Sequence, residues 1–148
     1  MENKLQGKTA FITGGSKGIG LGVAEAMVEQ GMKVAVTSRR QEAADEAAAH
    51  LQKMGGDALG IAADVRDFVA QESAVRRVLD EWGQLDVVIA NAGVGQFAPI
   101  EEMSPEQWHA VIDTNLTGVF YTTKATVPAL KESNGYLITI ASLAGANF

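Results

Sequence analysis

A glycine-rich segment near the start of the chain restricts the possible folds more than any other feature. Residues 13–20 read TGGSKGIG; they follow the apolar residues 10–12 and lead into the amphipathic stretch 21–30. A strand, a glycine turn and a helix in this order can hold a phosphate, because the first N–H groups of a helix lack internal partners and carry partial positive charge. The segment therefore predicts a phosphate site. A tight strand–helix turn without a ligand is the alternative.

The spacing of the glycines narrows the type of site. Gly14, Gly18 and Gly20 form Gly-x-x-x-Gly-x-Gly rather than the commoner Gly-x-Gly-x-x-Gly. A P-loop is excluded because Lys17 is followed by Gly18, where that motif needs Ser or Thr.

Composition excludes several classes of function. The 148 residues are 47% apolar, which suits a single domain over 1–148 with its own core. A net charge of −6 argues against nucleic-acid and anionic-membrane partners. The chain has no cysteine and two histidines, so no metal site is expected. The polar start is not a signal peptide, and no apolar run approaches a membrane span. We expect a cytoplasmic protein that acts on small molecules.

Short apolar runs alternate with longer periodic segments, which is typical of α/β folds. The predicted strands are 9–13, 33–38, 58–62, 87–90 and 136–141, and the predicted helices are 18–30, 41–54, 68–82 and 105–130. Right-handed crossovers then give a Rossmann-type doubly wound parallel sheet with strand order 3-2-1-4-5.

The fourth helix has a clear start: Ser104 as N-cap, Pro105 at the first position and Gln107 closing a capping box. Glycines at 31, 55, 83 and 135 are expected to cap the four helices in the left-handed conformation. The residues expected to face the core from the fourth helix are Trp108, Val111, Ile112, Leu116, Val119 and Phe120.

Chemically distinctive residues follow every predicted strand. After the glycine turn come Ser38-Arg39-Arg40, Asp64-Val65, Asn91-Ala92-Gly93 and finally Ser142. Ligands of such sheets bind beyond the carboxyl ends of the strands, so these residues should meet at one edge.

Together, the glycine turn, Asp64-Val65, Asn91-Ala92-Gly93, Asn115 and Ser142 resemble the short-chain dehydrogenase/reductase family. The resemblance implies an NAD(P)(H)-dependent oxidoreductase that interconverts an alcohol and a carbonyl, with a 3-oxoacyl-type or other ketone reductase among the candidates. It also implies catalytic Asn, Ser, Tyr and Lys residues, the last two in a Tyr-x-x-x-Lys motif that would lie beyond Phe148.

The chain is therefore expected to be the N-terminal part of a longer enzyme. Tyr121 and Lys124 are three apart rather than four, so they do not supply the motif. Moreover, no predicted helix covers the second face of strands 87–90 and 136–141, although both are apolar. The alternative is a non-catalytic nucleotide-binding module or fragment.

The residues after the second strand bear on cofactor choice. NAD sites usually place an acid here to hold the ribose 2′-hydroxyl, whereas this chain has Ser38 followed by Arg39 and Arg40. A guanidinium can bind a 2′-phosphate, and Lys17 adds a second cation. NADP(H) is thus the expected cofactor, with NAD(H) possible. A solvated basic loop is the alternative.

Roles for the remaining residues come from the resemblance. It implies that Asp64 accepts from the adenine amino group beside Val65; helix capping by Asp64 or Asp67 is the alternative. Asn91-Ala92-Gly93 leaves room for the cofactor ribose, unless it is a plain turn. The cofactor-binding residues of the first turn are Thr13, Gly14, Ser16, Lys17, Gly18, Ile19 and Gly20.

Asn115 lies on the expected apolar stripe, which predicts a buried amide that needs hydrogen-bond partners. The resemblance implies a place in a proton relay; a structural link from the fourth helix to the fourth strand is compatible with it. Ser142 could donate to a substrate oxygen, or be a simple strand-end serine. The resemblance also implies a homodimer or homotetramer paired through the fourth helix, whose residues 120–123 carry no charge.

Overall fold

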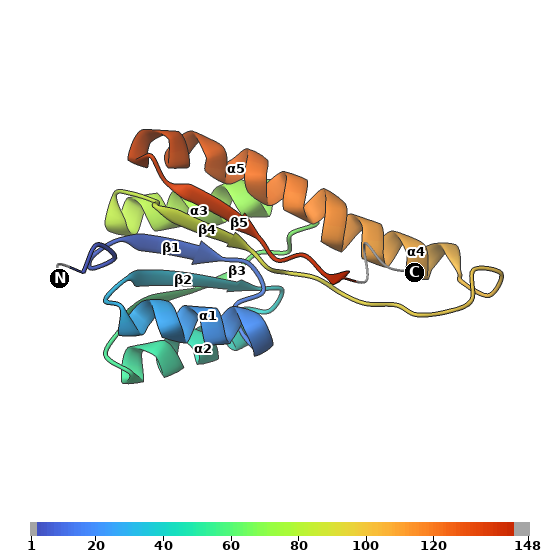
Figure 1. The fold of residues 1–148 in the computed structure, drawn as a ribbon, viewed down its shortest axis with the longest axis horizontal. Coiled ribbons are helices and arrows are strands. Elements are labelled where there is room, and N and C mark those ends of the chain that lie inside the picture. The colour runs from blue at the N-terminus through green and yellow to red at the C-terminus, as the bar shows by residue number, and fades with distance from the viewer. Residues whose placement is uncertain (1–2, 144–148) are drawn as a thin grey trace.

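Five parallel strands form the sheet in the order β3-β2-β1-β4-β5, as predicted (Figure 1). The computed structural model describes residues 3–143. The strands are β1 (Thr9–Ile12), β2 (Lys33–Ser38), β3 (Asp57–Ala62), β4 (Val87–Ala90) and β5 (Tyr136–Thr139). β1 and β5 end earlier than the sequence suggested, and every other strand boundary lies within one residue of the prediction.

Helices cover both faces of the sheet. α1 (Gly18–Glu29) and α2 (Gln41–Lys53) lie on one face, and α3 (Phe68–Trp82) and α5 (Gly118–Ser133) on the other (Figure 1). Side chains along β1 alternate between the two layers: Ala10 and Ile12 pack in the first, Phe11 in the second. This alternation gives the domain two apolar cores separated by the sheet.

None of the helices within residues 3–143 combines the length and the hydrophobicity that crossing a membrane would require.

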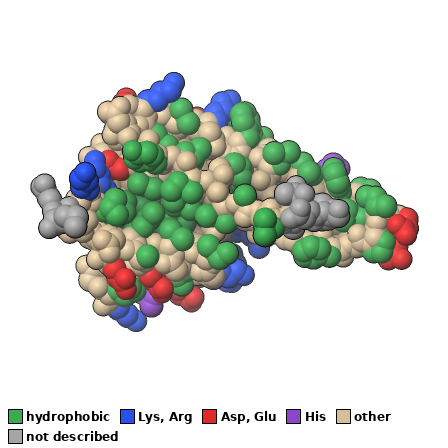
Figure 2. Space-filling model, viewed as in Figure 1, with side chains coloured by type: hydrophobic (Ala, Val, Ile, Leu, Met, Phe, Trp, Pro, Cys, Tyr) green, Lys and Arg blue, Asp and Glu red, His purple; other side chains and the backbone are tan. Residues whose placement is uncertain are grey.

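The outer face of β5 is open. Tyr136 is 72% exposed and Ile138 47% exposed, while Leu137 packs against the core on the other face. Figure 2 shows hydrophobic side chains gathered over this part of the sheet. The predicted uncovered face is therefore confirmed for β5. The same prediction is wrong for β4, because Ile89 of that strand is buried in the layer formed by α1 and α2.

The predicted fourth helix is divided in three. α4 (Pro105–Ile112) starts with the expected capping box of Ser104 and Gln107; a π-helical turn, η1 (Asp113–Thr117), then leads into α5. The expected core stripe is wrong: three of its members are more than half exposed, namely Trp108, Leu116 and Phe120. Neither α4 nor the π turn buries any of its residues, so the apolar stripe along them faces no core, and the π turn then changes the phase of the helix before α5.

α5 instead buries a face of small and hydroxyl-bearing residues, together with Leu130 near its end. A Cβ on Gly118 would lie 2.7 Å from Val65 Cγ2, so glycine allows this close approach. The Thr122 hydroxyl donates to the Gly118 carbonyl (2.9 Å), and that of Thr126 to the Thr122 carbonyl (2.8 Å). These bonds within the helix explain how threonines can face a core.

Three of the four predicted glycine caps are confirmed, because Gly31, Gly55 and Gly83 have positive φ. The fourth is wrong: Asn134, with φ 52°, takes the left-handed position after α5. Gly135 is needed for another reason, since a Cβ there would collide with the carbonyl oxygen of Asp86.

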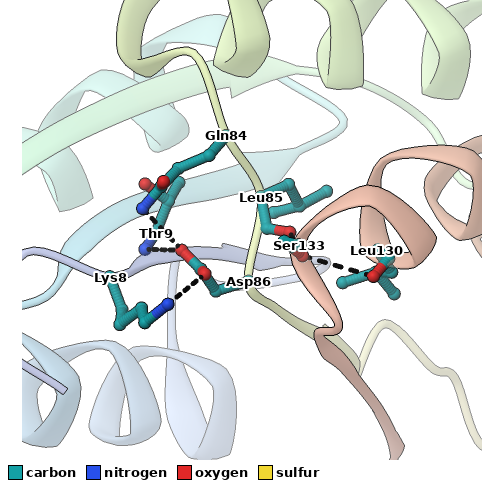
Figure 3. A network of polar contacts seen from close by, with 7 residues as sticks. All are labelled: Lys8, Thr9, Gln84, Leu85, Asp86, Leu130 and Ser133. Atoms are coloured by element: carbon teal, nitrogen blue, oxygen red, sulfur yellow. Dashed lines mark hydrogen bonds and ion pairs between the residues drawn. The ribbon is translucent and has the colours of Figure 1, made fainter. Parts of the chain in front are cut away.

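A polar network joins the amino-terminal ends of β1 and β4, at the edge opposite the predicted site (Figure 3). The Asp86 carboxylate is 93% buried and accepts from Lys8 Nζ (2.8 Å), the Thr9 backbone N–H (2.9 Å) and Gln84 Nε2 (2.9 Å). The Ser133 hydroxyl donates to the Leu85 carbonyl (2.6 Å), which connects the end of α5 to the same edge. The network sets the register at which β1, β4 and α5 meet.

Candidate functional site

The glycine turn joins β1 to α1, and each of its three motif glycines has its own structural reason. Gly14 (φ +62°) and Gly18 (φ +57°) adopt left-handed conformations. A Cβ on Gly14 would also lie 2.9 Å from Ala92 Cα. A Cβ on Gly20 would lie 2.5 Å from Asn91 Nδ2 and 2.6 Å from the Gly14 carbonyl oxygen. Larger residues would push the turn away from the segment after β4.

Asn91 and Thr13 fasten these two segments together. Asn91 Nδ2 donates to the carbonyls of Thr13 (3.0 Å) and Gly14 (3.2 Å). The Thr13 hydroxyl accepts from the backbone N–H groups of Asn91 (3.0 Å) and Ala92 (3.1 Å). The side chains of Thr13 and Asn91 thus hold the turn in place from within the protein.

A cleft of about 840 Å³ lies at the carboxyl ends of the strands. It brings together most of the predicted cofactor residues: Gly14, Ser16, Lys17, Gly18, Ile19, Ser38, Arg39, Arg40, Asp64, Val65, Asn91, Ala92 and Gly93. Thr13 and Gly20 are buried beneath the cleft and do not line it. Lining residues that the sequence reasoning missed are Ala43, Ala63, Arg66, Val94 and Thr114.

Two helices begin at the cleft without a capping side chain. Their N-cap residues, Lys17 for α1 and Arg40 for α2, line the cleft, and neither side chain caps its helix. In α3, by contrast, Asp67 accepts from the Ala70 N–H (3.1 Å), so the capping alternative applies to Asp67 and not to Asp64. Uncapped N-termini flanked by cations favour an anion.

Asp64 is the one acidic side chain among the lining residues, and Arg66 holds it. Arg66 donates from Nε to both carboxylate oxygens (3.0 and 3.1 Å) and from Nη2 to Oδ2 (2.6 Å). These hydrogen bonds hold the pKa of the Asp64 carboxyl below its usual value, and the positive charge of Arg39 adds to the effect. The signal missed in the sequence was Asp-x-Arg in a loop, where two side chains can turn toward each other.

A second cavity, of about 850 Å³, adjoins the first at Val94 and contains both predicted catalytic residues, Asn115 and Ser142. Its other lining residues are mainly apolar: Gly95, Gln96, Phe97, Ala98, Pro99, Met103 and Val111.

Asn115 lies in the π turn and is exposed, so the predicted burial is wrong. Its amide nevertheless has the expected partners. Nδ2 donates to the Val94 carbonyl (2.8 Å), and Oδ1 accepts from the Val94 N–H (2.8 Å). Asn115 thus connects the π turn to the segment that follows β4, which is the structural link that the sequence left open. The prediction of a buried Asn115 was wrong because the apolar stripe that carries Asn115 faces outward.

The whole described site can be compared with known proteins. The family model for short chain dehydrogenases matches residues 8–148. A 3-oxoacyl-[acyl-carrier-protein] reductase of Synechocystis sp. is 38% identical over 143 residues; these are 95% of this chain and 58% of that protein. The chain thus spans little more than half the length of this relative.

Solved structures agree with the fold. An alcohol dehydrogenase from the archaeon Thermococcus sibiricus, complexed with 5-hydroxy-NADP, is 35% identical with a TM-score of 0.92; the match covers 97% of this chain and 61% of that one. A short chain dehydrogenase/reductase from Burkholderia phymatum, in complex with NAD, is 27% identical with a TM-score of 0.91; the match covers 98% of this chain and 52% of that one. With its strand order, its glycine turn and these matches, the chain belongs to the short-chain dehydrogenase family.

Proposed function

We propose that the chain binds NADP(H), in preference to NAD(H), and that it serves an oxidoreductase that interconverts an alcohol and a carbonyl. One observation carries the proposal. The glycine turn, two helix N-termini and four basic side chains meet in one cleft, with no acid at the end of β2.

The residues of the cleft fit a dinucleotide. A Cβ on Gly18 would meet no protein atom within 4 Å, so space over the turn is open to a ligand. The N–H groups of the first turn of α1 are suited to the pyrophosphate. Asp64 and Val65, which follow β3, would take the adenine end, and Ala92 and Gly93 leave room for the ribose beyond β4.

The preference for NADP(H) rests on Ser38, Arg39 and Lys17. A carboxylate at the end of β2 would repel a 2′-phosphate, and Ser38 has no charge. Arg39 can donate two charge-assisted hydrogen bonds to a phosphate, and Lys17 adds a second positive charge to the lining of the same cleft. Of the related structures, one contains an NADP derivative and another NAD, so the family by itself allows both.

The second cavity is where a substrate would lie. A bound nicotinamide supplies or accepts the hydride. Ser142 can donate a hydrogen bond to the substrate oxygen and stabilise the negative charge that develops there. Asn115 keeps the wall of this cavity in place through Val94. The apolar lining suits a ketone with an aliphatic chain, in agreement with a relative named as a 3-oxoacyl-[acyl-carrier-protein] reductase.

The proton donor expected from the family is not among the 148 residues, which contain no Tyr-x-x-x-Lys. The 148-residue chain alone should therefore bind cofactor with little turnover, since losing a general acid costs roughly 10²–10⁴-fold in rate. Ketone reduction by the purified chain at the rate of a complete reductase would contradict this assignment.

Binding of NADPH and NADH to the chain, followed by nicotinamide fluorescence, tests the cofactor proposal. The wild-type chain should bind NADPH more tightly, and Arg39→Asp should abolish or reverse the preference. Arg76→Asp makes the same charge change on the exposed surface of α3, outside the cleft, and should leave the preference intact. Tighter binding of NADH by the wild-type chain would refute the proposal.

A further inference from the structure

Charges of alternating sign follow one another along the adenine side of the cleft. Asp64 interacts electrostatically with Arg66 and with Arg39, and Arg66 also interacts electrostatically with Asp113. Among these, only the Arg66–Asp64 pair is in direct contact, with three side-chain hydrogen bonds of 2.6–3.1 Å. The Arg66 backbone N–H adds a fourth bond to Asp64 Oδ1 (3.0 Å).

The location of this pair gives it a consequence for the ligand. Asp64 is the sole acid among the residues that line the cleft, and it lies within electrostatic reach of Arg39, the proposed phosphate ligand. An unpaired Asp64 carboxylate would attract the Arg39 guanidinium and repel an incoming phosphate, which carries a charge near −2. Arg66 occupies both Asp64 oxygens and so removes this competition.

The Asp64 loop is also held from beneath. Gln71, fully buried in α3, donates from Nε2 to the Asp64 carbonyl (3.3 Å), and its Oε1 lies 3.2 Å from Thr122 Oγ1 in α5. The backbone of Asp64 is thus tied to two helices while its carboxylate is tied to Arg66. The fold therefore fixes the position of the Arg66–Asp64 pair in the cleft.

We propose that Arg66 is a specificity-determining residue, which neutralises Asp64 so that Arg39 stays available for the 2′-phosphate of the cofactor. The proposal rests on the proposed NADP(H) preference. Arg66 acts through Asp64 and is not itself a ligand of the phosphate. Removing Arg66 should therefore harm binding of a 2′-phosphate only when the Asp64 carboxylate is present.

Two mononucleotides isolate this effect. Adenosine 2′,5′-bisphosphate and 5′-AMP differ by the 2′-phosphate alone, so the ratio of their dissociation constants cancels contacts to the adenine and to the 5′-phosphate. Isothermal titration of the 148-residue chain at fixed ionic strength gives this ratio. It also needs no catalytic turnover.

The wild-type chain should prefer the bisphosphate. Arg66→Gln should reduce the preference about fivefold, the upper end of what an exposed ion pair contributes. The double variant Asp64→Asn/Arg66→Gln should return it to within about twofold of wild type. Asp64→Asn alone should keep or raise it. Arg77→Gln, on the exposed surface of α3, removes the same charge outside the cleft and controls for net charge.

The outcomes separate the two proposals. A wild-type chain without preference overturns the proposed NADP(H) selectivity and the role of Arg66 with it. A wild-type preference that Arg66→Gln leaves unchanged overturns the role of Arg66 alone. If Arg66→Gln lowers the preference for the bisphosphate and the added Asp64→Asn does not restore it, then Arg66 contacts the phosphate directly, which also overturns the proposal.

Discussion

Replacing Gly20 by alanine tests how the site is assembled, because the cost can be worked out from contacts. The new Cβ would lie 2.5 Å from Asn91 Nδ2 and 2.6 Å from the Gly14 carbonyl, about 1 Å inside normal contact. Asn91 must then move and lose its two hydrogen bonds to the turn, at about 1 kcal/mol each. Overpacking adds about 1–3 kcal/mol to this loss of stability, whereas the higher helix propensity of alanine offsets up to about 1 kcal/mol of it.

The net expectation for Gly20→Ala is a loss of about 2–4 kcal/mol in the free energy of unfolding. Gly22 is a matched control in the same helix, since it is exposed and a Cβ there would meet nothing within 4 Å. Gly22→Ala should stabilise the chain by about 0.5–1 kcal/mol. Urea unfolding followed by circular dichroism measures both values.

A double-mutant cycle tests the mechanism. Asn91→Ala should cost about 2 kcal/mol in the wild-type chain but much less in the Gly20→Ala background, where its hydrogen bonds are already lost. Equal costs in the two backgrounds, or a Gly20→Ala variant as stable as Gly22→Ala, would refute the reasoning.

Three further predictions concern the scaffold. Asp86→Ala should destabilise the chain by about 2–4 kcal/mol in urea unfolding, because it removes three hydrogen bonds and leaves the buried Thr9 backbone N–H unpaired. Lys8→Met removes one of these bonds and leaves the Asp86 carboxylate its other two donors, so it should cost less, about 1–2 kcal/mol, and equal losses would contradict this. Asn134→Gly should keep stability within a few tenths of a kcal/mol, whereas Asn134→Val should lose about 1–2 kcal/mol at φ 52°; the same assay decides. If the protein forms the expected homo-oligomer through α5, Phe120→Glu should shift its mass in light scattering toward the monomer, and a monomeric wild-type protein at micromolar concentration would end that prediction.

The sequence alone determined the features that follow from local rules. Strand order came from the alternation of strands and helices and from the handedness of crossovers, and the structure confirms it. The capping box at Ser104 was readable because its partners are three residues apart. The convergence of most predicted cofactor residues in one cleft followed from their places at the ends of parallel strands.

Tertiary structure decided the features that depend on contacts distant in sequence or on helix phase. The bonds between Asn91 and Thr13 span 78 residues, and no spacing rule connects them. Leu116 in the π turn and Phe120 in α5 face outward, whereas Thr122 and Thr126 pack inward with their hydroxyls bonded to their own helix. Periodicity could not reveal this, because it assumes a constant number of residues per turn and says nothing of which neighbour a face meets.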